Sequence, residues 1–186
     1  MKEKRETSSA LTRGFLELAV TVHMSRLEAA ESASNCSKKR IGCVIFSSGG
    51  ALASGHNGAL HGDSECSRHF KFGPSGSCSP RKGKGVWNSH YDFSKVHEIH
   101  AEADAIASLA ASGYAIPEGV ELAALVSYSP CHQCFLLLAR IGVRHILFKH
   151  VYRRECDNFG LARKMGVSLY TVERNFRGEW LVYRAN

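Results

Sequence analysis

The sequence predicts an α/β protein with three layers, in which helices cover both faces of a five-stranded mixed sheet whose last strands are parallel. Strands and helices alternate from residue 100 to residue 172, which favours parallel pairing through helical crossovers. Two earlier apolar runs joined by Ser-Ser-Gly-Gly predict an antiparallel hairpin. A length of 186 residues suits one domain spanning residues 1–186.

The N-terminal third is expected to form one long helix and the hairpin. Residues 7–34 form the helix, and Leu11, Phe15, Leu18 and Val22 recur at helical spacing, which predicts that they face the core. The hairpin consists of a buried strand, a turn and a returning strand, over residues 41–46, 47–50 and 51–54.

The second half is expected to alternate regularly. Helices are predicted at residues 100–112, 131–141 and 155–165, and strands at residues 121–127, 145–149 and 167–172. The tail at residues 173–186 carries Trp180, Leu181 and Tyr183, so it is expected either to dock on the body or to serve a subunit contact.

An insertion at about residues 57–97 interrupts this pattern. Periodicity is lost there, and Gly, Ser, Pro, His, Cys and basic residues dominate. Irregular stretches of this length are uncommon inside compact domains. The insertion is therefore either disordered or pinned by a further interaction.

Composition limits the class of protein. The hydrophobic fraction is 44%, and no apolar run approaches the length of a membrane span. The N-terminus lacks the apolar core of a signal peptide, so a cytoplasmic location is expected, or the host cytoplasm for a viral protein. Seven cysteines, two of them in Cys-x-x-Cys, indicate metal ligands and free thiols.

The formal net charge of +7 admits anionic partners such as nucleotides or nucleic acid. Two short basic clusters, at residues 38–40 and 81–84, contribute to it. Neither cluster is interleaved with aromatic residues, so a solvated face is the better interpretation of each.

Two motifs carry chemistry. His100-Ala101-Glu102 precedes Pro130-Cys131-His132-Gln133-Cys134, and one imidazole with two thiolates can hold zinc while leaving the fourth position open for water. The cysteines are three residues apart, so at a helix start they share one side. The alternative is that these are scattered core cysteines and a surface histidine. It does not explain why the histidine, the glutamate, both cysteines and the preceding proline all occur at the expected spacing.

This arrangement resembles the signature of the zinc-dependent nucleobase deaminases. The resemblance implies that His100, Cys131 and Cys134 bind a catalytic zinc ion. It also implies that Glu102 shuttles protons between the attacking water and the base, a role that suits a carboxylate whose pKa the pocket raises.

Further features resemble the deoxycytidylate (dCMP) deaminases, especially those of large bacteriophages. Residues 54–58 are similar to that family's Gly-Tyr-Asn-Gly segment, residues 39–45 to its basic residue, Val-Gly and strand, and residues 98–102 to its Glu-Ile-His-Ala-Glu. The resemblance implies a cytidine-deaminase-like fold and a hydrolase acting on a cyclic amidine. This enzyme would convert dCMP to dUMP and ammonia, and so supply dUMP for dTMP synthesis.

By the same resemblance, five residues contact the substrate. Asn57 binds the deoxyribose, the amide of Ala101 binds the pyrimidine edge, and Val44, Tyr128 and Tyr152 line the site. Taken alone, Asn57 is as well explained by a turn before Gly58, and Tyr128 by core packing. Lys39, Arg40 and Tyr152 are candidates for the phosphate, although an ordinary surface role fits each of them better in isolation.

The phage members carry a second, structural zinc, and this would pin the insertion. The matching residues here are Cys36, Cys66, His90 and Glu98, an acceptable set of zinc ligands. Rival ligands are Cys78, His69 and His97. Glu98 is alternatively an acid at a helix start.

Regulation and assembly follow from the family as well. In regulated members the region matching Gly55, His56, Asn57 and Gly58 helps to bind dCTP or dTTP, with magnesium accompanying the nucleotide. His56 replaces the usual tyrosine, which leaves regulation open. Family members are commonly homohexamers.

Other functions stay open. The Ser-Tyr-Ser-Pro-Cys stretch at residues 127–131 resembles that of polynucleotide cytosine deaminases, which predicts salt-dependent binding to single-stranded DNA or RNA. The insertion is expected to crowd such a groove. A 5-substituted dCMP is another candidate substrate. A non-enzymatic, zinc-stabilised assembly protein is a third class, but only chemistry requires Glu102.

Overall fold

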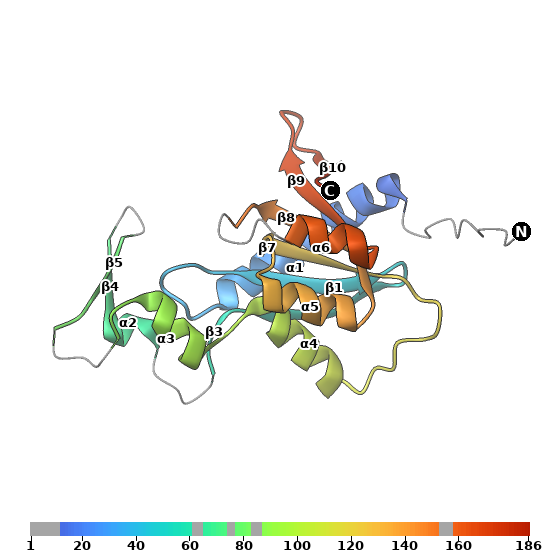
Figure 1. Cartoon of the computed structure of the whole chain (residues 1–186). Coiled ribbons are helices and arrows are strands. Elements are labelled where there is room, and N and C mark those ends of the chain that lie inside the picture. The colour runs from blue at the N-terminus through green and yellow to red at the C-terminus, as the bar shows by residue number, and fades with distance from the viewer. Residues whose placement is uncertain (1–11, 61–64, 74–76, 83–86, 153–157) are drawn as a thin grey trace, which may run out of the picture.

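A six-stranded mixed sheet forms the centre of the molecule in a computed structural model (Figure 1), which describes residues 12–60, 65–73, 77–82, 87–152 and 158–186. The strand order is β10-β9-β8-β7-β1-β2. The strands are β1 (Gly42–Ser47), β2 (Gly50–His56), β7 (Leu122–Tyr128), β8 (Val143–His150), β9 (Ser168–Arg174) and β10 (Trp180–Arg184). The β7–β8 and β8–β9 pairs are parallel, as predicted, and the other neighbours are antiparallel.

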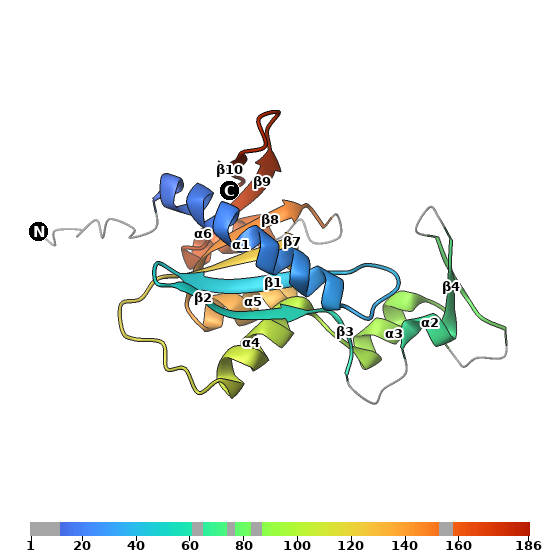
Figure 2. The ribbon, with the colours of Figure 1, turned by 180° about the vertical axis from the view of Figure 1, so that it is seen from behind.

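Helices cover both faces of this sheet, which confirms the three-layer arrangement. Helix α1 (Arg13–Ala33) lies on one face and is seen in front of the sheet in Figure 2. The other face carries α4 (Ala101–Ala111), α5 (His132–Arg140) and α6 (Asn158–Met165). Because side chains alternate along a strand, Val44 and Phe46 pack towards α1 whereas Cys43 and Ile45 pack towards α4 and α5.

The sheet has one strand more than the five expected. The tail folds back as β10, which pairs with β9 from Trp180 opposite Arg174 to Arg184 opposite Tyr170. Asn175 and Gly178 close the connecting turn, and Gly178 adopts a φ of 82°. The tail therefore docks on the body by extending the sheet.

The predicted core-facing side of α1 is wrong for Leu18 and Val22, whereas Phe15 packs, partly buried, against the core. Leu18 and Val22 are 62% and 58% exposed, and the helix instead buries Leu16, Val20 and Leu27. Apolar residues occur on both sides of this helix, so spacing alone does not single out the buried one. Leu11 lies outside the described residues.

The insertion forms a small lobe beside the sheet (Figures 1 and 2), with more regular structure than its sequence suggests. Its elements are β3 (Gly58–Ala59), α2 (Cys66–His69), β4 (Phe70–Phe72), β5 (Cys78–Pro80), α3 (His90–His97) and β6 (Glu98–Ile99). Strand β3 pairs with β6, and β4 pairs with β5. The lobe has a separate core made of Cys36, Cys66, Phe70 and Phe93.

Helix α4 approaches β2 very closely at Gly55. A Cβ atom on Gly55 would lie 2.2 Å from the backbone nitrogen of Ala105 and 2.6 Å from the carbonyl oxygen of Ala101. The missing side chain therefore lets α4 pack directly against β2. This contact fixes how close the N-terminus of α4 lies to the sheet.

In the described part of the chain, no helix combines the length and the apolar character that a membrane span requires.

Candidate active site and metal centres

Two helix starts bring the predicted catalytic ligands together. His100 caps the N-terminus of α4, and Cys131 caps the N-terminus of α5, directly after β7 and the Ser129-Pro130 turn. His100 Nδ1 lies 3.5 Å from Cys131 Sγ and 3.4 Å from Cys134 Sγ. The ligand atoms of all three residues lie within 4.8 Å of one another.

These separations fit a zinc ion. Tetrahedral zinc with Zn–N and Zn–S bonds of about 2.0–2.3 Å requires ligand atoms roughly 3.5 Å apart. One imidazole nitrogen and two sulfurs at this spacing form three corners of such a tetrahedron. The predicted set of His100, Cys131 and Cys134 therefore has both the chemistry and the spacing of a three-ligand zinc site.

Glu102 lies in the first turn of α4, two residues after His100, and is only 5% exposed. Burial raises the pKa of its carboxyl group above the usual range, and the neighbouring His100 opposes this effect in part. A carboxylate with a raised pKa accepts a proton more readily near neutral pH, which is the property expected of a proton shuttle.

The two thiols of this cluster behave as a pair that shares a proton. The hydrogen bond from Cys134 lowers the pKa of Cys131 to about 4, and the same bond raises the pKa of Cys134. The bond to Cys131 also raises the pKa of His100. A metal ion that binds here must displace the protons of Cys134 and His100.

Aromatic and basic side chains gather at the ends of β7 and β8, where Tyr128 precedes Cys131 by three residues, and Lys39 joins them from the segment before β1. Lys39 Nζ lies 4.0 Å from the centre of the Tyr128 ring and 5.8 Å from that of Tyr152. The His150 ring lies 5.0 Å from Tyr128. The Ser129 hydroxyl accepts a hydrogen bond of 2.7 Å from the backbone N–H of Tyr152, which ties the two loops together. We call Lys39, Tyr128, His150 and Tyr152 the rim cluster.

The Asn57 amide is largely committed to the fold. Its Oδ1 accepts hydrogen bonds of 2.8 Å from Ser34 Oγ and from the backbone N–H of Ile41, and its Nδ2 donates to the carbonyl of Lys39 at 2.9 Å. These bonds hold the segment that places Lys39 in the rim cluster. Within the described residues, one amide hydrogen of Asn57 is left for a sugar hydroxyl.

The two remaining substrate candidates differ in their position. Ala101 is the first residue of α4, where backbone N–H groups have no partner within the helix, so its amide suits the predicted contact. Val44 is fully buried on the α1 face of the sheet, away from α4. The strand alternation that turns Cys43 towards α4 turns Val44 away, so the Val44 side chain does not line this site.

The four residues of the predicted regulatory segment all take part in the fold. Gly55 packs against α4, and the His56 backbone N–H donates to Asp104 Oδ2 at 2.9 Å. Gly58 adopts a φ of 149° and lies against Asn35, whose Oδ1 would be 2.0 Å from an added Cβ. Each of the four residues therefore contributes a backbone or side-chain contact to the fold.

The predicted ligands of the second zinc lie together as well. Cys36, Cys66, His90 and Glu98 place their ligand atoms within 4.8 Å of one another. His90 Nε2 lies 3.5 Å from Cys36 Sγ and 3.5 Å from Glu98 Oε1, again the spacing of tetrahedral zinc ligands. Glu98 Oε1 is buried without a hydrogen bond, among the residues described, which leaves it suited to a metal.

In this second cluster, as in the first, the pKa of one thiol is lowered and the pKa of the other is raised. The hydrogen bond from Cys36 lowers the pKa of Cys66 to about 5, and the same pairing raises that of Cys36. Although burial opposes a charged imidazole, the neighbouring Cys66 and the carboxylate of Glu98 raise the pKa of His90 to about 9. The rivals Cys78, His69 and His97 lie outside the cluster, and both histidines pack against Phe93.

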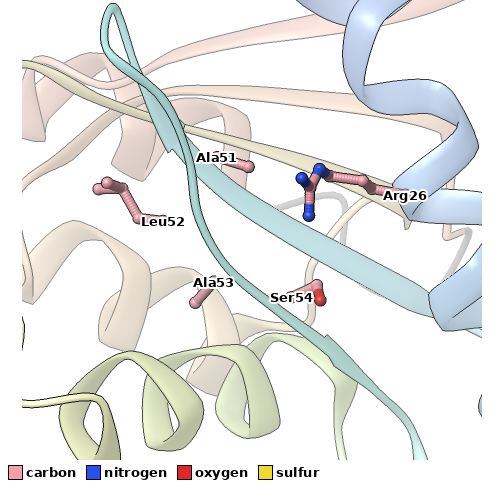
Figure 3. A pocket seen from close by; sticks show the side chains of 5 residues that line it. All are labelled: Arg26, Ala51, Leu52, Ala53 and Ser54. Atoms are coloured by element: carbon pink, nitrogen blue, oxygen red, sulfur yellow. The ribbon is translucent and has the colours of Figure 1, made fainter.

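A pocket elsewhere on the molecule has no part in either cluster. Figure 3 shows it at the edge strand β2, lined by Arg26 from α1 and by residues 51–54. None of the candidate metal ligands lines it.

Two groups around the site escaped sequence analysis. The buried Asn158 on α6 holds the loop of Cys131. Glu31 on α1 accepts hydrogen bonds of 2.6 Å from Ser127 and 2.8 Å from Lys149, and thereby ties β7 and β8 to α1 below the rim cluster. Neither group forms a local motif, so spacing alone could not reveal them.

Comparison with known proteins places this geometry in context. The family model described as the cytidine and deoxycytidylate deaminase zinc-binding region matches residues 18–150. Deoxycytidylate deaminase of Saccharomyces cerevisiae is 27% identical over 143 residues, which cover 75% of this chain and 40% of the yeast protein. That of Enterobacteria phage T2 is 25% identical over 163 residues, which cover 76% of this chain and 85% of the phage protein.

Solved structures show the same fold. The dCMP deaminase of cyanophage S-TIM5 in complex with dCMP and dUMP superposes with a TM-score of 0.57 and 23% identity, over 81% of this chain and 94% of the cyanophage chain. A bifunctional deaminase/reductase from Thermotoga maritima gives a TM-score of 0.51 at 17% identity, over 84% of this chain and 37% of that chain.

Proposed function

Because the chain belongs to the family of cytidine and deoxycytidylate deaminases, we propose that it catalyses the hydrolytic deamination of dCMP to dUMP and ammonia. The observation that carries the proposal is the zinc-ligand geometry of His100, Cys131 and Cys134, with the buried carboxyl group of Glu102 beside it. Phage and yeast relatives named deoxycytidylate deaminase support the choice of substrate.

His100, Cys131 and Cys134 would hold the catalytic zinc. When bound, zinc supplies a Lewis acid that makes a water-derived nucleophile available at neutral pH. Glu102 takes a proton from the attacking water and delivers it to ring nitrogen N3. It then passes a second proton to the amino group at C4, which leaves as ammonia, so that dCMP and water give dUMP and ammonia. Burial keeps this carboxyl group out of bulk solvent during both transfers.

Substitution of Glu102 tests this assignment. Glu102→Gln keeps the size of the side chain and should keep zinc, but it removes the proton-carrying carboxylate. We expect dUMP formation to fall by about 10²–10⁴-fold, the usual contribution of a general acid–base residue. A variant that binds zinc and still turns over at the wild-type rate would contradict the mechanism.

The rim cluster is the proposed site for the substrate phosphate. Lys39 is the cation that lies over the ring of Tyr128, three residues before Cys131, and Arg40 is exposed beside it in the sequence. A phosphate here would exchange a cation–π contact for a charge-assisted hydrogen bond, which is stronger. The proposed substrate class is therefore the nucleoside monophosphate, with Asn57 as the proposed deoxyribose contact.

We further propose that Cys36, Cys66, His90 and Glu98 hold a second, structural zinc. Four ligands close the coordination sphere, as structural sites require. The lobe has a core of few residues, so metal binding would replace the apolar burial that it lacks.

Zinc content tests the second site. Wild-type protein should hold two equivalents per chain and Cys66→Ser about one, because a serine hydroxyl does not replace a thiolate. Cys78→Ser is the matched control, since Cys78 belongs to the same lobe but not to the cluster, and it should keep two. One equivalent in the wild-type protein would rule out the second site.

A further inference from the structure

Asn158 contacts both neighbours of a candidate zinc ligand. It is the first residue of α6 and is 4% exposed. Its Nδ2 donates a hydrogen bond of 2.8 Å to the carbonyl oxygen of Pro130, and its Oδ1 lies 3.2 Å from His132 Nδ1. Pro130 and His132 stand immediately before and after Cys131.

The chemistry of the partners fixes the orientation of this amide. The Pro130 carbonyl can only accept, so the NH₂ group of Asn158 must face it. The oxygen of Asn158 therefore faces His132, whose Nδ1 carries a hydrogen and donates. The bond to Pro130 is buried and the bond to the exposed His132 is partly buried, so breaking either leaves a polar atom of the buried Asn158 unsatisfied.

We propose that Asn158 is a positioning residue that aims the Cys131 thiolate at the catalytic zinc. This inference rests on the proposed function insofar as Cys131 is a zinc ligand. Cys131 caps α5 with extended backbone angles, and its side chain makes no capping hydrogen bond. Besides its contacts with His100 and Cys134, the direction of the Cys131 sulfur is set by the Pro130–Cys131 peptide and by the first residue of α5, which are the two groups that Asn158 holds.

Asn158 links helix α6 to the loop that carries Cys131. Helix α6 packs on the sheet through Ala162, which is fully buried. The asparagine thus connects a helix that supplies no zinc ligand to the loop that supplies one. Groups that orient zinc ligands in this way typically contribute 10–100-fold to metal affinity.

Asn186 provides a matched control. It also uses both ends of its amide to hold the backbone, accepting from the Leu169 N–H at 2.8 Å and donating to the Val167 carbonyl at 2.9 Å. These bonds join the C-terminus to the start of β9 and do not involve the Cys131 loop. Loss of Asn186 should lower stability without affecting the zinc ion.

The test is the rate at which zinc passes from the loaded protein to a coloured chelator. The phase that belongs to the catalytic site is the one that Cys131→Ser lacks. We expect Asn158→Ala to accelerate zinc release in that phase about ten-fold or more. Zinc release from the proposed structural site should keep its wild-type rate. The rate of deamination should fall in parallel with the loss of catalytic zinc. Asn186→Ala should release zinc at the wild-type rate at a matched distance below its melting temperature.

Equal rates for Asn158→Ala and Asn186→Ala would overturn the proposal and leave Asn158 a merely structural residue. If Asn158→Ala does not fold, His132→Phe removes one of the two bonds and leaves α6 intact. It should accelerate the same phase by a smaller factor, and no acceleration would again overturn the proposal. A wild-type protein with no phase that depends on Cys131 would contradict the zinc site itself and, with it, the proposed function.

Discussion

At the scale of single residues, Lys39 and Lys38 differ sharply although they are neighbours. Both are exposed, but only Lys39 lies over the Tyr128 ring, where a substrate phosphate is proposed to bind. Lys39→Ala should raise the KM for dCMP by about 10-fold, since a charge-assisted hydrogen bond contributes roughly 1.5–3 kcal/mol. It should leave turnover of deoxycytidine, which has no phosphate, at the wild-type value.

Steady-state kinetics on both substrates measure this effect, with Lys38→Ala as the control that should match the wild type. Equal losses in the two variants would point to the overall positive charge instead of a local phosphate site. An equal loss on deoxycytidine would remove Lys39 from phosphate binding.

His23 offers a test of stability against pH. It is buried on α1 against Phe46, and its Nδ1 has no hydrogen-bond partner among the described residues. Burial, assisted by the nearby Arg26, lowers the pKa of His23 below 6.5. Since the unfolded chain takes up a proton first, stability falls as pH drops below about 6.5, by up to about 1.4 kcal/mol per pH unit.

Denaturant titrations of the wild type and His23→Phe at several pH values measure this contribution. The difference in free energy of unfolding should stay constant above about pH 7.5 and should shift in favour of the variant between pH 6.5 and 5. Parallel curves over the whole range would show that His23 takes up its proton equally in both states.

Residues linked by short spacing could be predicted from the sequence. His100 and Glu102, or Cys131 and Cys134, lie within one helical turn, so the chain itself brings them to one side. Asn158 is different, because only the packing of α6 brings it to the Cys131 loop. The bonds of Asn57 to Ser34 and Lys39 also depend on the fold and not on the local sequence.

At the scale of elements, the contact between α4 and β2 should control the catalytic helix. Gly55→Ala would force a Cβ into backbone atoms of α4, which cannot rotate away as a side chain could. We expect a loss of about 1–3 kcal/mol in stability and a loss of activity, because α4 carries His100 and Glu102.

Gly160→Ala is the matched control, since nothing lies within 4 Å of the added Cβ on α6. It should be neutral or stabilising by about 0.5–1 kcal/mol through helix propensity. Thermal unfolding measures the stability of the two variants, and dUMP formation measures their activity. A Gly55→Ala protein as stable and active as Gly160→Ala would mean that α4 has room to shift without consequence.

Elements whose burial follows one clear period were predicted well. The alternating pattern of residues 100–172 predicted the parallel strands, and Ser-Ser-Gly-Gly predicted the hairpin. Helix α1 was assigned the wrong core face because Leu18 and Val22 are apolar but exposed. Strand β10 was missed because the short turn between Asn175 and Gly178 was not recognised as a hairpin connection.

At the scale of the whole molecule, we propose the exposed side of α1 as a subunit contact. Leu18 and Val22 are one helical turn apart, and both project from the face that the sheet does not cover. A contiguous exposed apolar patch can mark a subunit contact. We expect light scattering to give a mass that is a multiple of the 20.4 kDa chain, whereas a monomer at micromolar concentration would contradict this.

The central claim is that the site at the starts of α4 and α5 deaminates a cytosine nucleotide. The most direct test is ammonia release by purified, zinc-loaded protein from dCMP, CMP, deoxycytidine, dCTP and a cytosine-containing single-stranded oligonucleotide, each with and without added dCTP and magnesium. Strong preference for dCMP, with formation of dUMP, is the predicted result. Activity on the oligonucleotide alone, or no ammonia from any substrate, would contradict the account.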